Sequence, residues 1–395
     1  MMTEQEAELN AIREITGFLL IDDKKRYLTR LGLVMTFFFK NSYTPEKKVQ
    51  IISCFRRFRE LYAGRLRFHT HNRKGMKKYS PENIEKLEQY IKASEPNDVV
   101  EWYISDAKNG DEAPEYVMRC LNSYEVDGTW GTSYLSLYLP WNILFTEEGK
   151  QEFQDWVTFL CKELEPDHGD CGYTLVMPRD YYLCMPQEYE LAQRYPAIVV
   201  NSTVHMAASE YENSIRSVQW LTFLADRYIE RLGGETHVRK VLSIDPDITL
   251  TRYPGGLIIQ AGGYPDITPR PGTPPESYYL INELIRPIRY VLQEGHSLHF
   301  LGDGHFTGKT SKQWYERYDR GPLVVSPLYA GEPARVDGYW TTKGRENVET
   351  IFLQGTPAID IEGNPPGRTE WRLIREIPHD NERDLKLLEQ KLNGR

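Results

Sequence analysis

The sequence lacks long apolar runs and has few cysteines. Its longest apolar stretch, at residues 31–39, is interrupted by Gly32 and is far shorter than the roughly 18 residues that a membrane span needs. We therefore expect no membrane association. The first residues include Glu4, Glu6 and Glu8, where a secretory signal would carry positive charge before an apolar stretch. This pattern predicts a cytoplasmic protein.

The five cysteines form no CxxC pair, and their odd number and irregular spacing fit neither a disulfide framework nor a zinc ribbon. We expect them to be reduced and buried, since free cysteine is among the most buried residue types. The cysteines are Cys54, Cys120, Cys161, Cys171 and Cys184.

Sequence motifs for common catalytic sites are also missing. Neither GxSxG nor HExxH occurs, and the nearest approach to a phosphate loop, Gly308-Lys309-Thr310, has Asp303 where the motif requires glycine. His168-Gly169-Asp170-Cys171 places a cysteine near a histidine, but its composition predicts a turn. We expect no catalytic residues and no cofactor, and so a protein that is not an enzyme.

One alternative stays open at this point, a metal-dependent hydrolase. Its ligands would come from His296, His299, Asp303 and His305. In a strand, however, His296 and His299 would point to opposite faces, because side chains alternate. A turn with hydrogen-bonded histidines explains the same spacing.

The composition is that of a folded protein. Of its 395 residues 40% are hydrophobic and 12% aromatic, which argues against disorder. Clusters of β-prone segments alternate with groups of helices, which favours an α+β fold with antiparallel or mixed sheets flanked by helices. We expect two related subdomains, 1–200 and 201–320, and a loop-rich extension, 321–395, that ends in an amphipathic helix at 382–392.

Local signals place several elements. Thr44-Pro45 and Ser80-Pro81 are typical helix starts, and Pro254-Gly255-Gly256 between two β-prone runs predicts a hairpin. The expected strands are 31–39, 65–71, 99–104, 116–121, 133–139, 217–224, 248–253 and 257–261, and further helices are expected at 4–20, 151–164, 226–232 and 274–292, the last kinked at Pro287.

Charge is distributed unevenly along the chain. Residues 40–78 contain 12 Lys and Arg against 2 Asp and Glu, whereas residues 95–170 contain 4 against 17. Because the net charge is −9 and no nucleic-acid motif accompanies the basic stretch, we do not expect nucleic-acid binding. The acidic stretch is either a solvated face or a contact surface for a basic protein. The candidate partner-binding residues are Asp106, Asp111, Glu112, Glu115, Asp127, Asp167 and Asp170.

Five segments together resemble a family once catalogued as a domain of unknown function and now described as type VI secretion immunity proteins. They are residues 31–66 (LGLVMTFFF through the Tyr-Thr-Pro helix start), 217–234 (SVQWLTFLADRYIERLGG), 257–264 (LIIQAGGY), 274–290 (PPESYYLINELIRPIRY) and 314–319 (WYERYD). The resemblance extends over roughly residues 27 to 320, and the tail beyond Gly321 departs from it.

The resemblance implies a cognate inhibitor of a secreted toxin, in particular a nuclease effector, that acts by direct binding to its active or DNA-binding surface. It carries over no catalytic residue. A nuclease presents a basic surface to DNA, so the acidic stretch would suit such a partner. The oligomeric state is not indicated by the sequence.

Overall fold

The structure is a computed structural model of the full chain. It describes residues 9–10, 12, 14–15, 19–72, 75–122, 125–126, 129–204, 208–211, 213–293, 295–299, 305–321, 327–342 and 349–377. The expected C-terminal helix at 382–392 lies outside these residues, as do most positions of the helix expected at 4–20.

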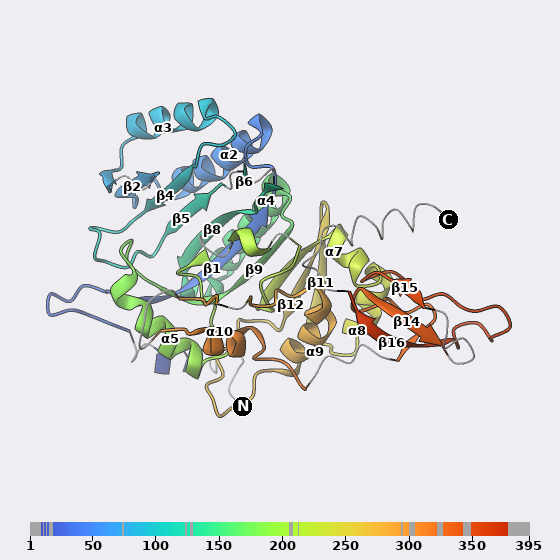
Figure 1. The fold of residues 1–395 in the computed structure, drawn as a ribbon. Coiled ribbons are helices and arrows are strands. Elements are labelled where there is room, and N and C mark those ends of the chain that lie inside the picture. The colour runs from blue at the N-terminus through green and yellow to red at the C-terminus, as the bar shows by residue number, and fades with distance from the viewer. Residues whose placement is uncertain are drawn as a thin grey trace. The chain divides into compact units, whose positions relative to one another are not determined.

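A ten-stranded antiparallel sheet forms the centre of the larger part of the chain (Figure 1). Its strands, in spatial order, are β11 (Ile248–Tyr253), β12 (Gly256–Ala261), β10 (Leu221–Ala225), β9 (His168–Val176), β1 (Arg30–Phe39), β8 (Ser133–Pro140), β5 (Val117–Leu121), β4 (Glu101–Ser105), β2 (Phe68–His71) and β3 (Lys77–Lys78). The strands beyond residue 200 therefore extend the same sheet as those before it. A short two-stranded ribbon, β6 (Glu125–Val126) and β7 (Thr129–Trp130), lies between β5 and β8 in the chain.

Strand β1 is central because it is apolar on both sides. It pairs with β8 and β9 along almost its whole length, with Leu33 opposite Leu139 and Tyr173. Residues 31–39 are all buried, as expected of a strand between two layers. Alternate residues such as Leu33 and Phe37 belong to one apolar cluster, whereas Phe38 belongs to another on the opposite face.

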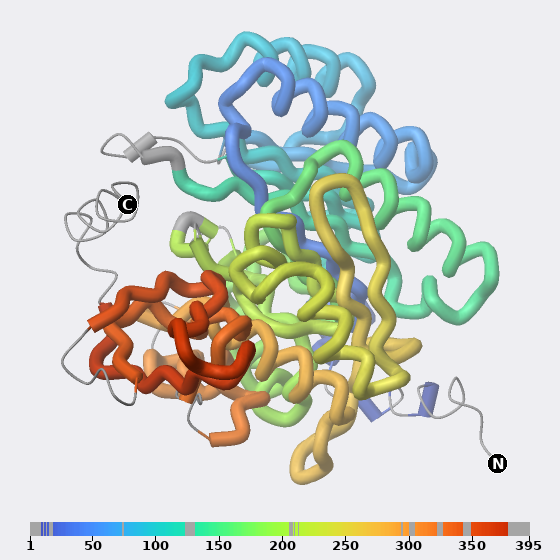
Figure 2. Tube along the Cα trace, turned by 90° about the vertical axis from the view of Figure 1, so that its right-hand side faces the viewer, coloured from blue at the N-terminus to red at the C-terminus, as the bar shows by residue number. Residues whose placement is uncertain are grey.

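Three helices cover the first face, and each begins at a side-chain cap. They are α2 (Pro45–Tyr62), α3 (Pro81–Ala93) and α4 (Glu147–Leu164), which Figure 2 shows on one side of the sheet. The hydroxyl of Thr44 accepts from the backbone N–H of Lys47 at 3.2 Å, and Ser80 caps α3 in the same way. The expected helix starts at Thr44 and Ser80 are thus confirmed.

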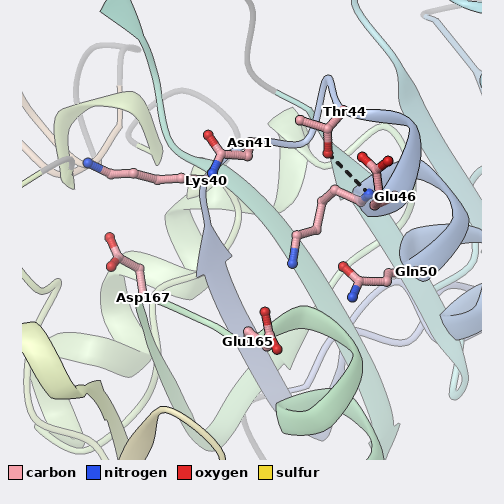
Figure 3. A pocket seen from close by; sticks show the side chains of 8 residues that line it. Lys40, Asn41, Thr44, Glu46, Gln50, Glu165 and Asp167 are labelled. Carbon is pink, nitrogen blue, oxygen red and sulfur yellow. Dashed lines mark hydrogen bonds between the residues drawn. The ribbon is translucent and has the colours of Figure 1, made fainter.

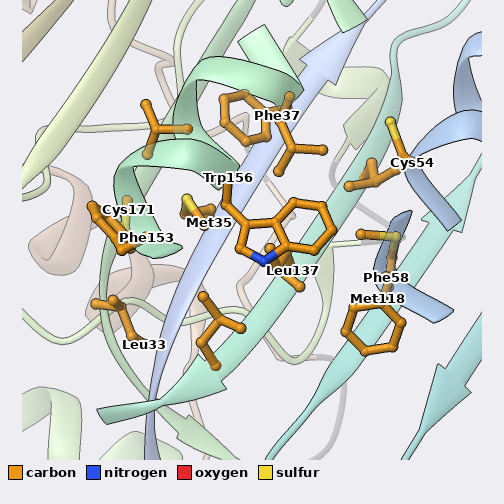
Figure 4. Packing of buried hydrophobic residues seen from close by; sticks show 14 of the residues in the cluster. Leu33, Met35, Phe37, Cys54, Phe58, Met118, Leu137, Phe153, Trp156 and Cys171 are labelled. Atoms are coloured by element: carbon orange, nitrogen blue, oxygen red, sulfur yellow. The ribbon is translucent and has the colours of Figure 1, made fainter. Parts of the chain in front are cut away.

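Trp156 of α4 lies at the middle of this core (Figure 4). It is fully buried among side chains of β1, β8, β5 and α2, and its indole N–H donates to the hydroxyl of Tyr62 at 3.0 Å. Phe55 of α2 stacks on Trp102 of β4 with ring centroids 3.8 Å apart. All five cysteines are buried and none forms a disulfide, as the sequence predicted.

The opposite face is covered by α5 (Met185–Arg194), α10 (Gly308–Tyr315) and residues of the segments 200–204 and 208–211. Two short 3₁₀ turns belong to this part of the chain, η2 (Tyr182–Cys184) before α5 and η3 (Ala208–Tyr211), whereas a third, η1 (Trp141–Phe145), precedes α4. Polar side chains are buried on this face together with apolar ones, including those of Thr36, Ser136 and Asp170. The two faces of one sheet are therefore chemically different.

The turn predicted at His168–Cys171 is wrong, because these residues begin β9. The strand is buried throughout. Gly169 is required by the close approach of β1, since a Cβ there would lie 2.7 Å from the carbonyl oxygen of Thr36. Histidine, glycine and aspartate are typical of turns, but here neighbouring strands and buried partners accommodate them.

The predicted hairpin is confirmed as β11 and β12, with Gly255 at φ 82° in the turn. Helix α7 (Asp226–Arg231) follows β10 and is succeeded by α8 (Glu235–Leu242). The helix expected at 274–292 is shorter than predicted: α9 (Glu276–Ile285) ends before Pro287, and a 3₁₀ turn, η4 (Arg286–Ile288), replaces the expected kink.

Contacts between Cα atoms divide the chain into two compact units. The larger comprises residues 1–226, 243–282 and 289–319, and the smaller comprises 227–242, 283–288 and 320–395. In the smaller unit four strands form an antiparallel sheet, β13 (Leu328–Tyr329), β16 (Glu370–Glu376), β14 (Gly338–Thr342) and β15 (Thr350–Phe352). They enclose an apolar cluster around Trp340, Phe352 and Trp371.

The architecture confirms the expected α+β class. Domain borders at residues 200 and 320 stay a prediction. Among the described residues, no helix has the length and apolar character to cross a membrane.

Strand β2 carries a buried histidine whose titration should affect stability. His69 is 1% exposed, and burial, with His71 and Lys77 nearby, lowers its pKa from 6.5 to about 4. The unfolded chain therefore binds more protons between pH 4 and 6.5, so the folded state loses stability as the pH falls through this window. We expect a loss of about 3 kcal/mol in the free energy of unfolding.

Urea unfolding at pH 7 and pH 4.5 measures this effect. Because carboxylates titrate in the same range, His69→Gln is the control: its pH dependence should be clearly weaker than that of the natural protein. Parallel curves for the two proteins would contradict the prediction.

Candidate functional site

The predicted partner-binding residues that the structure describes fall into three separate places in the larger unit. The first is the acidic loop, which we define as residues 106–116 between β4 and β5. A carboxylate oxygen of Asp106 accepts from the backbone N–H groups of Glu115 and Tyr116 at 2.9 and 3.0 Å, which fixes the base of the loop. Burial raises the pKa of Asp106. This residue is a structural support of the loop.

The other carboxylates of the acidic loop face two arginines. Glu115 lies 2.6 Å from a guanidinium nitrogen of Arg30, and Glu112 lies 4.0 Å from the same side chain. Asp111 lies 3.8 Å from Arg26 and is 76% exposed at its side chain. These arginines lie outside residues 95–170, so a count of charges along that stretch leaves them out. The surface of the acidic loop is therefore less acidic than the count suggests. Glu112 is buried, which leaves Asp111 and Glu115 as the accessible carboxylates.

Asp167 lies at the other end of the strands. It precedes β9, whose His168 pairs with Phe38 near the end of β1, whereas the acidic loop lies beside Arg30 at the start of β1. Nine residue steps along a strand correspond to about 30 Å. The structure therefore does not bring Asp167 together with the acidic loop. Asp127 lies outside the described residues.

Asp167 lines a surface pocket of about 340 Å³ (Figure 3). The lining is of mixed charge, with three carboxylates and two lysines, and its residues are Lys40, Asn41, Thr44, Glu46, Lys47, Gln50, Glu165 and Asp167. Lys47 donates to the carbonyl oxygen of Leu164 at 2.8 Å, at the end of α4. Its partial burial lowers the pKa of its ammonium group.

Two residues of this pocket have left-handed backbones. Asn41 has φ 61°, and Glu165, which follows α4, has φ 46° in a position where helices usually place glycine. A glutamate in this conformation costs roughly 1–2 kcal/mol relative to glycine.

Asp170, the last of the selected carboxylates, is in the core. It lies on β9, is 1% exposed, and forms a bidentate ion pair with Arg216, whose Nε donates to it at 2.7 Å. Arg216 also donates to the side-chain oxygen of Asn201 at 2.7 Å, and Asn201 donates to the hydroxyl of Tyr138 at 2.7 Å. Asp170 therefore acts inside the sheet packing, away from any exposed acidic face.

A second buried carboxylate continues this network. Glu188 of α5 accepts from the backbone N–H groups of Asn201 and Ser202 at 3.0 and 3.2 Å and from the hydroxyl of Ser202. The ring of His299 lies 3.0 Å from the same carboxylate. Since the backbone N–H of Phe306 points to Nδ1 of His299, the proton of the imidazole is on Nε2 and is donated to Glu188.

These contacts do not favour the metal-site alternative. His296 lies 3.1 Å from Glu210, whereas His299 belongs to the buried network, and Asp303 lies outside the described residues. The rings of His299 and His305 are 5.5 Å apart. Within the ranges that the structure describes, no three His, Cys, Asp or Glu side chains are grouped to hold a metal ion.

Sequence reasoning did not identify the arginines that decide these sites. Arg26, Arg30 and Arg216 carry no motif, and each contacts one of the selected carboxylates or its loop across a long stretch of sequence, although Arg26 also pairs with the nearby Asp22. The only local sign is that Arg30 precedes an apolar strand, which places it at an end of the sheet. Their pairing is a result of the tertiary structure.

The fold makes this an α+β protein. Its predicted contact carboxylates are ion-paired in the acidic loop at one end of the sheet, line a small surface pocket at the other end, or are hydrogen-bonded in the core. A family profile described as "TsiV: Type VI immunity for VRR-NUC" matches residues 50–318. The chain belongs to this family of type VI immunity proteins. The match confirms the family resemblance seen in the sequence.

Among solved structures, the chain is similar to the Pseudomonas aeruginosa T6SS protein PA0821. The TM-score is 0.67 at 23% sequence identity, and the alignment covers 80% of this chain and 92% of that one. At this identity the likeness shows a shared fold. No curated protein sequence matches the chain.

The Asp170–Arg216 pair should be important for stability. We expect Arg216→Met to lower the free energy of unfolding by about 3–5 kcal/mol, because it leaves a buried carboxylate without its cation. The double variant Asp170→Leu/Arg216→Met removes both charges and should be less destabilised than the single variant. Chemical denaturation measures both.

The matched control is Arg252→Met, which removes an ion pair with Asp226 whose side chains are 44% and 50% exposed. Exposed pairs contribute about 0–1 kcal/mol, so this variant should be nearly as stable as the natural protein. If Arg216→Met and Arg252→Met lower the free energy of unfolding equally, the buried ion pair contributes no more to stability than an exposed one.

Proposed function

We propose that the protein protects its cell by binding a VRR-NUC nuclease effector of a type VI secretion system and blocking its activity. The observation that carries this proposal is the family match over residues 50–318, with its description as type VI immunity for VRR-NUC. Since a nuclease effector harms a cell through its nucleic acid, the proposed place of action is the cytoplasm. The protein acts by occupying the toxin and performs no chemistry on it.

The acidic loop is the proposed contact for the basic surface of the nuclease. A protein that binds DNA presents Lys and Arg to phosphates, and carboxylates can take the place of those phosphates. Asp111 is 76% exposed at its side chain and Glu115 is 45% exposed. Arg30 holds Glu115 at 2.6 Å, which reduces the side-chain entropy that this carboxylate loses on binding. Asp106 fixes the base of the loop through two backbone hydrogen bonds, and Glu112 is buried.

Stoichiometric inhibition tests the proposed function. Purified protein is titrated into a nuclease assay with the cognate VRR-NUC protein. We expect activity to fall linearly and to end near one protein per nuclease, because inhibition is by occupation. Inhibition by far less than one equivalent would indicate an enzyme that inactivates the toxin, and the absence of both inhibition and co-purification would refute the proposal.

Charge reversal tests the contact surface. Asp111→Lys/Glu115→Lys should weaken binding about tenfold at low salt, mainly through slower association, and the difference should shrink as salt is raised. The control is Glu82→Lys/Glu85→Lys on α3, which makes the same charge change at exposed positions elsewhere. If both double variants bind alike, the acidic loop is not the contact.

A further inference from the structure

A short hairpin next to the acidic loop has an unusual exposed surface. We define the arm as residues 20–28, which Figure 1 shows as a dark-blue loop projecting to the left of the sheet. Ile21 and Tyr27 form an antiparallel bridge across it. Directly opposed residues of an antiparallel pair place their side chains on the same side. Ile21 is 54% exposed and Tyr27 is 43% exposed, so the arm presents an apolar pair to solvent.

The arm is held rigidly. Asp22 accepts from the backbone N–H groups of Lys24 and Arg26 at 3.0 and 2.8 Å and from the guanidinium of Arg26 at 2.7 Å. The backbone hydrogen bond from Arg26 is the main cause that lowers the pKa of Asp22. Lys25 completes the turn with φ 60°. A preorganised hairpin loses little entropy when it binds, which is the property expected of an interface element.

Two neighbouring elements contact the arm. The backbone N–H of Ala113 in the acidic loop donates to the carbonyl oxygen of Tyr27 at 2.8 Å, so the exposed carboxylates of that loop flank the arm. On η2, the thiol of Cys184 lies 3.8 Å from the carbonyl oxygen of Leu28. The residue before it, Leu183, is 88% exposed, the largest value among the described large apolar side chains that are exposed.

We propose that the arm is the apolar anchor of the nuclease interface, inserted into a recess of the VRR-NUC protein that is lined by apolar side chains and bordered by cations on the side of the acidic loop. This inference rests on the proposed function and deepens it. Single exposed apolar residues are common, but an opposed Ile–Tyr pair on a rigid projection beside exposed carboxylates matches an interface with an apolar centre and a charged rim.

The arm precedes residue 50, where the family match begins, so the family description gives it no role. Its tip carries Lys24 and Lys25, which are exposed. The partner recess should therefore carry acceptor groups at its far end and cations at its mouth, beside Asp111 and Glu115. This opposite arrangement of charge fixes one orientation of the complex.

Affinity measurements on alanine variants of the full chain test the anchor. We expect Ile21→Ala/Tyr27→Ala to weaken binding to the cognate VRR-NUC protein at least tenfold, through faster dissociation and with little dependence on salt. Because Tyr27 also lies 4.6 Å from the guanidinium of Arg30, the single variant Ile21→Ala is measured separately. It should weaken binding at least threefold without disturbing the acidic loop.

The matched control is Ile244→Ala, at an isoleucine that is 76% exposed elsewhere, and it should bind within threefold of the natural chain. Binding of the double variant within threefold, while the natural chain binds tightly, would overturn the anchor and leave the proposed function intact. Failure of the natural chain itself to bind would overturn both. A double variant that changes self-association and keeps its nuclease affinity would also overturn the anchor.

Discussion

The ion pair between Asp170 and Arg216 is the interaction on which the centre of the structure depends. Strand β9 lies between β1 and β10, and its first residues are polar. A carboxylate that is 1% exposed would be too costly to bury alone, so β9 can occupy this place only because Arg216 satisfies both of its oxygens. Asn201 then links the same arginine to Tyr138 of β8, so the pair connects strands on both sides of β1.

This polar centre also explains why the two faces of the sheet differ. One face packs apolar side chains of α2, α3 and α4 around Trp156 and needs few hydrogen bonds. The other holds Asp170, Arg216, Glu188 and His299 in a hydrogen-bonded network. Networks of this kind specify a single packing arrangement, because each buried group tolerates only the partner that satisfies it. The network therefore supports the strands whose ends are exposed.

The two ends of the sheet carry different exposed groups. The acidic loop and the arm lie together at the start of β1, whereas the mixed-charge pocket lies at its far end, about 30 Å away along the strand. The exposed carboxylates Asp111 and Glu115 are partly balanced by Arg26 and Arg30. The proposed interface therefore combines apolar burial with a limited charge contribution, as is common where the core of a contact is apolar and its rim is charged.

Elements with a local signal were predictable from the sequence. The hydroxyls of Thr44 and Ser80 each accept from a backbone N–H three residues later, at the start of a helix, and Gly255 supplies the turn of β11 and β12. Elements that depend on distant partners were not. The residues His168–Cys171 are typical of a turn, but they form a strand because they pair with β1 and β10 and because Arg216, 46 residues away, pairs with the buried Asp170.

The candidate site also has features that the sequence indicated and features that depend on distant partners. The sequence indicated the acidic loop through the density of carboxylates between residues 95 and 170, and it indicated the family through its segment patterns. It did not show that Asp170 is buried, that Asp167 lines a surface pocket far from the acidic loop, or that Arg30 pairs with Glu115.

By itself the sequence determined the α+β class, the helix caps, the hairpin and membership in an immunity family, because each follows from residues close together or from a pattern along the chain. Only the tertiary structure decided which charges are exposed, which are paired and which lie side by side. The physical reason is that burial and ion pairing depend on contacts between segments far apart in sequence. Asp111 and Asp170 are both acidic residues of one stretch, yet the first is at the surface and the second is in the core.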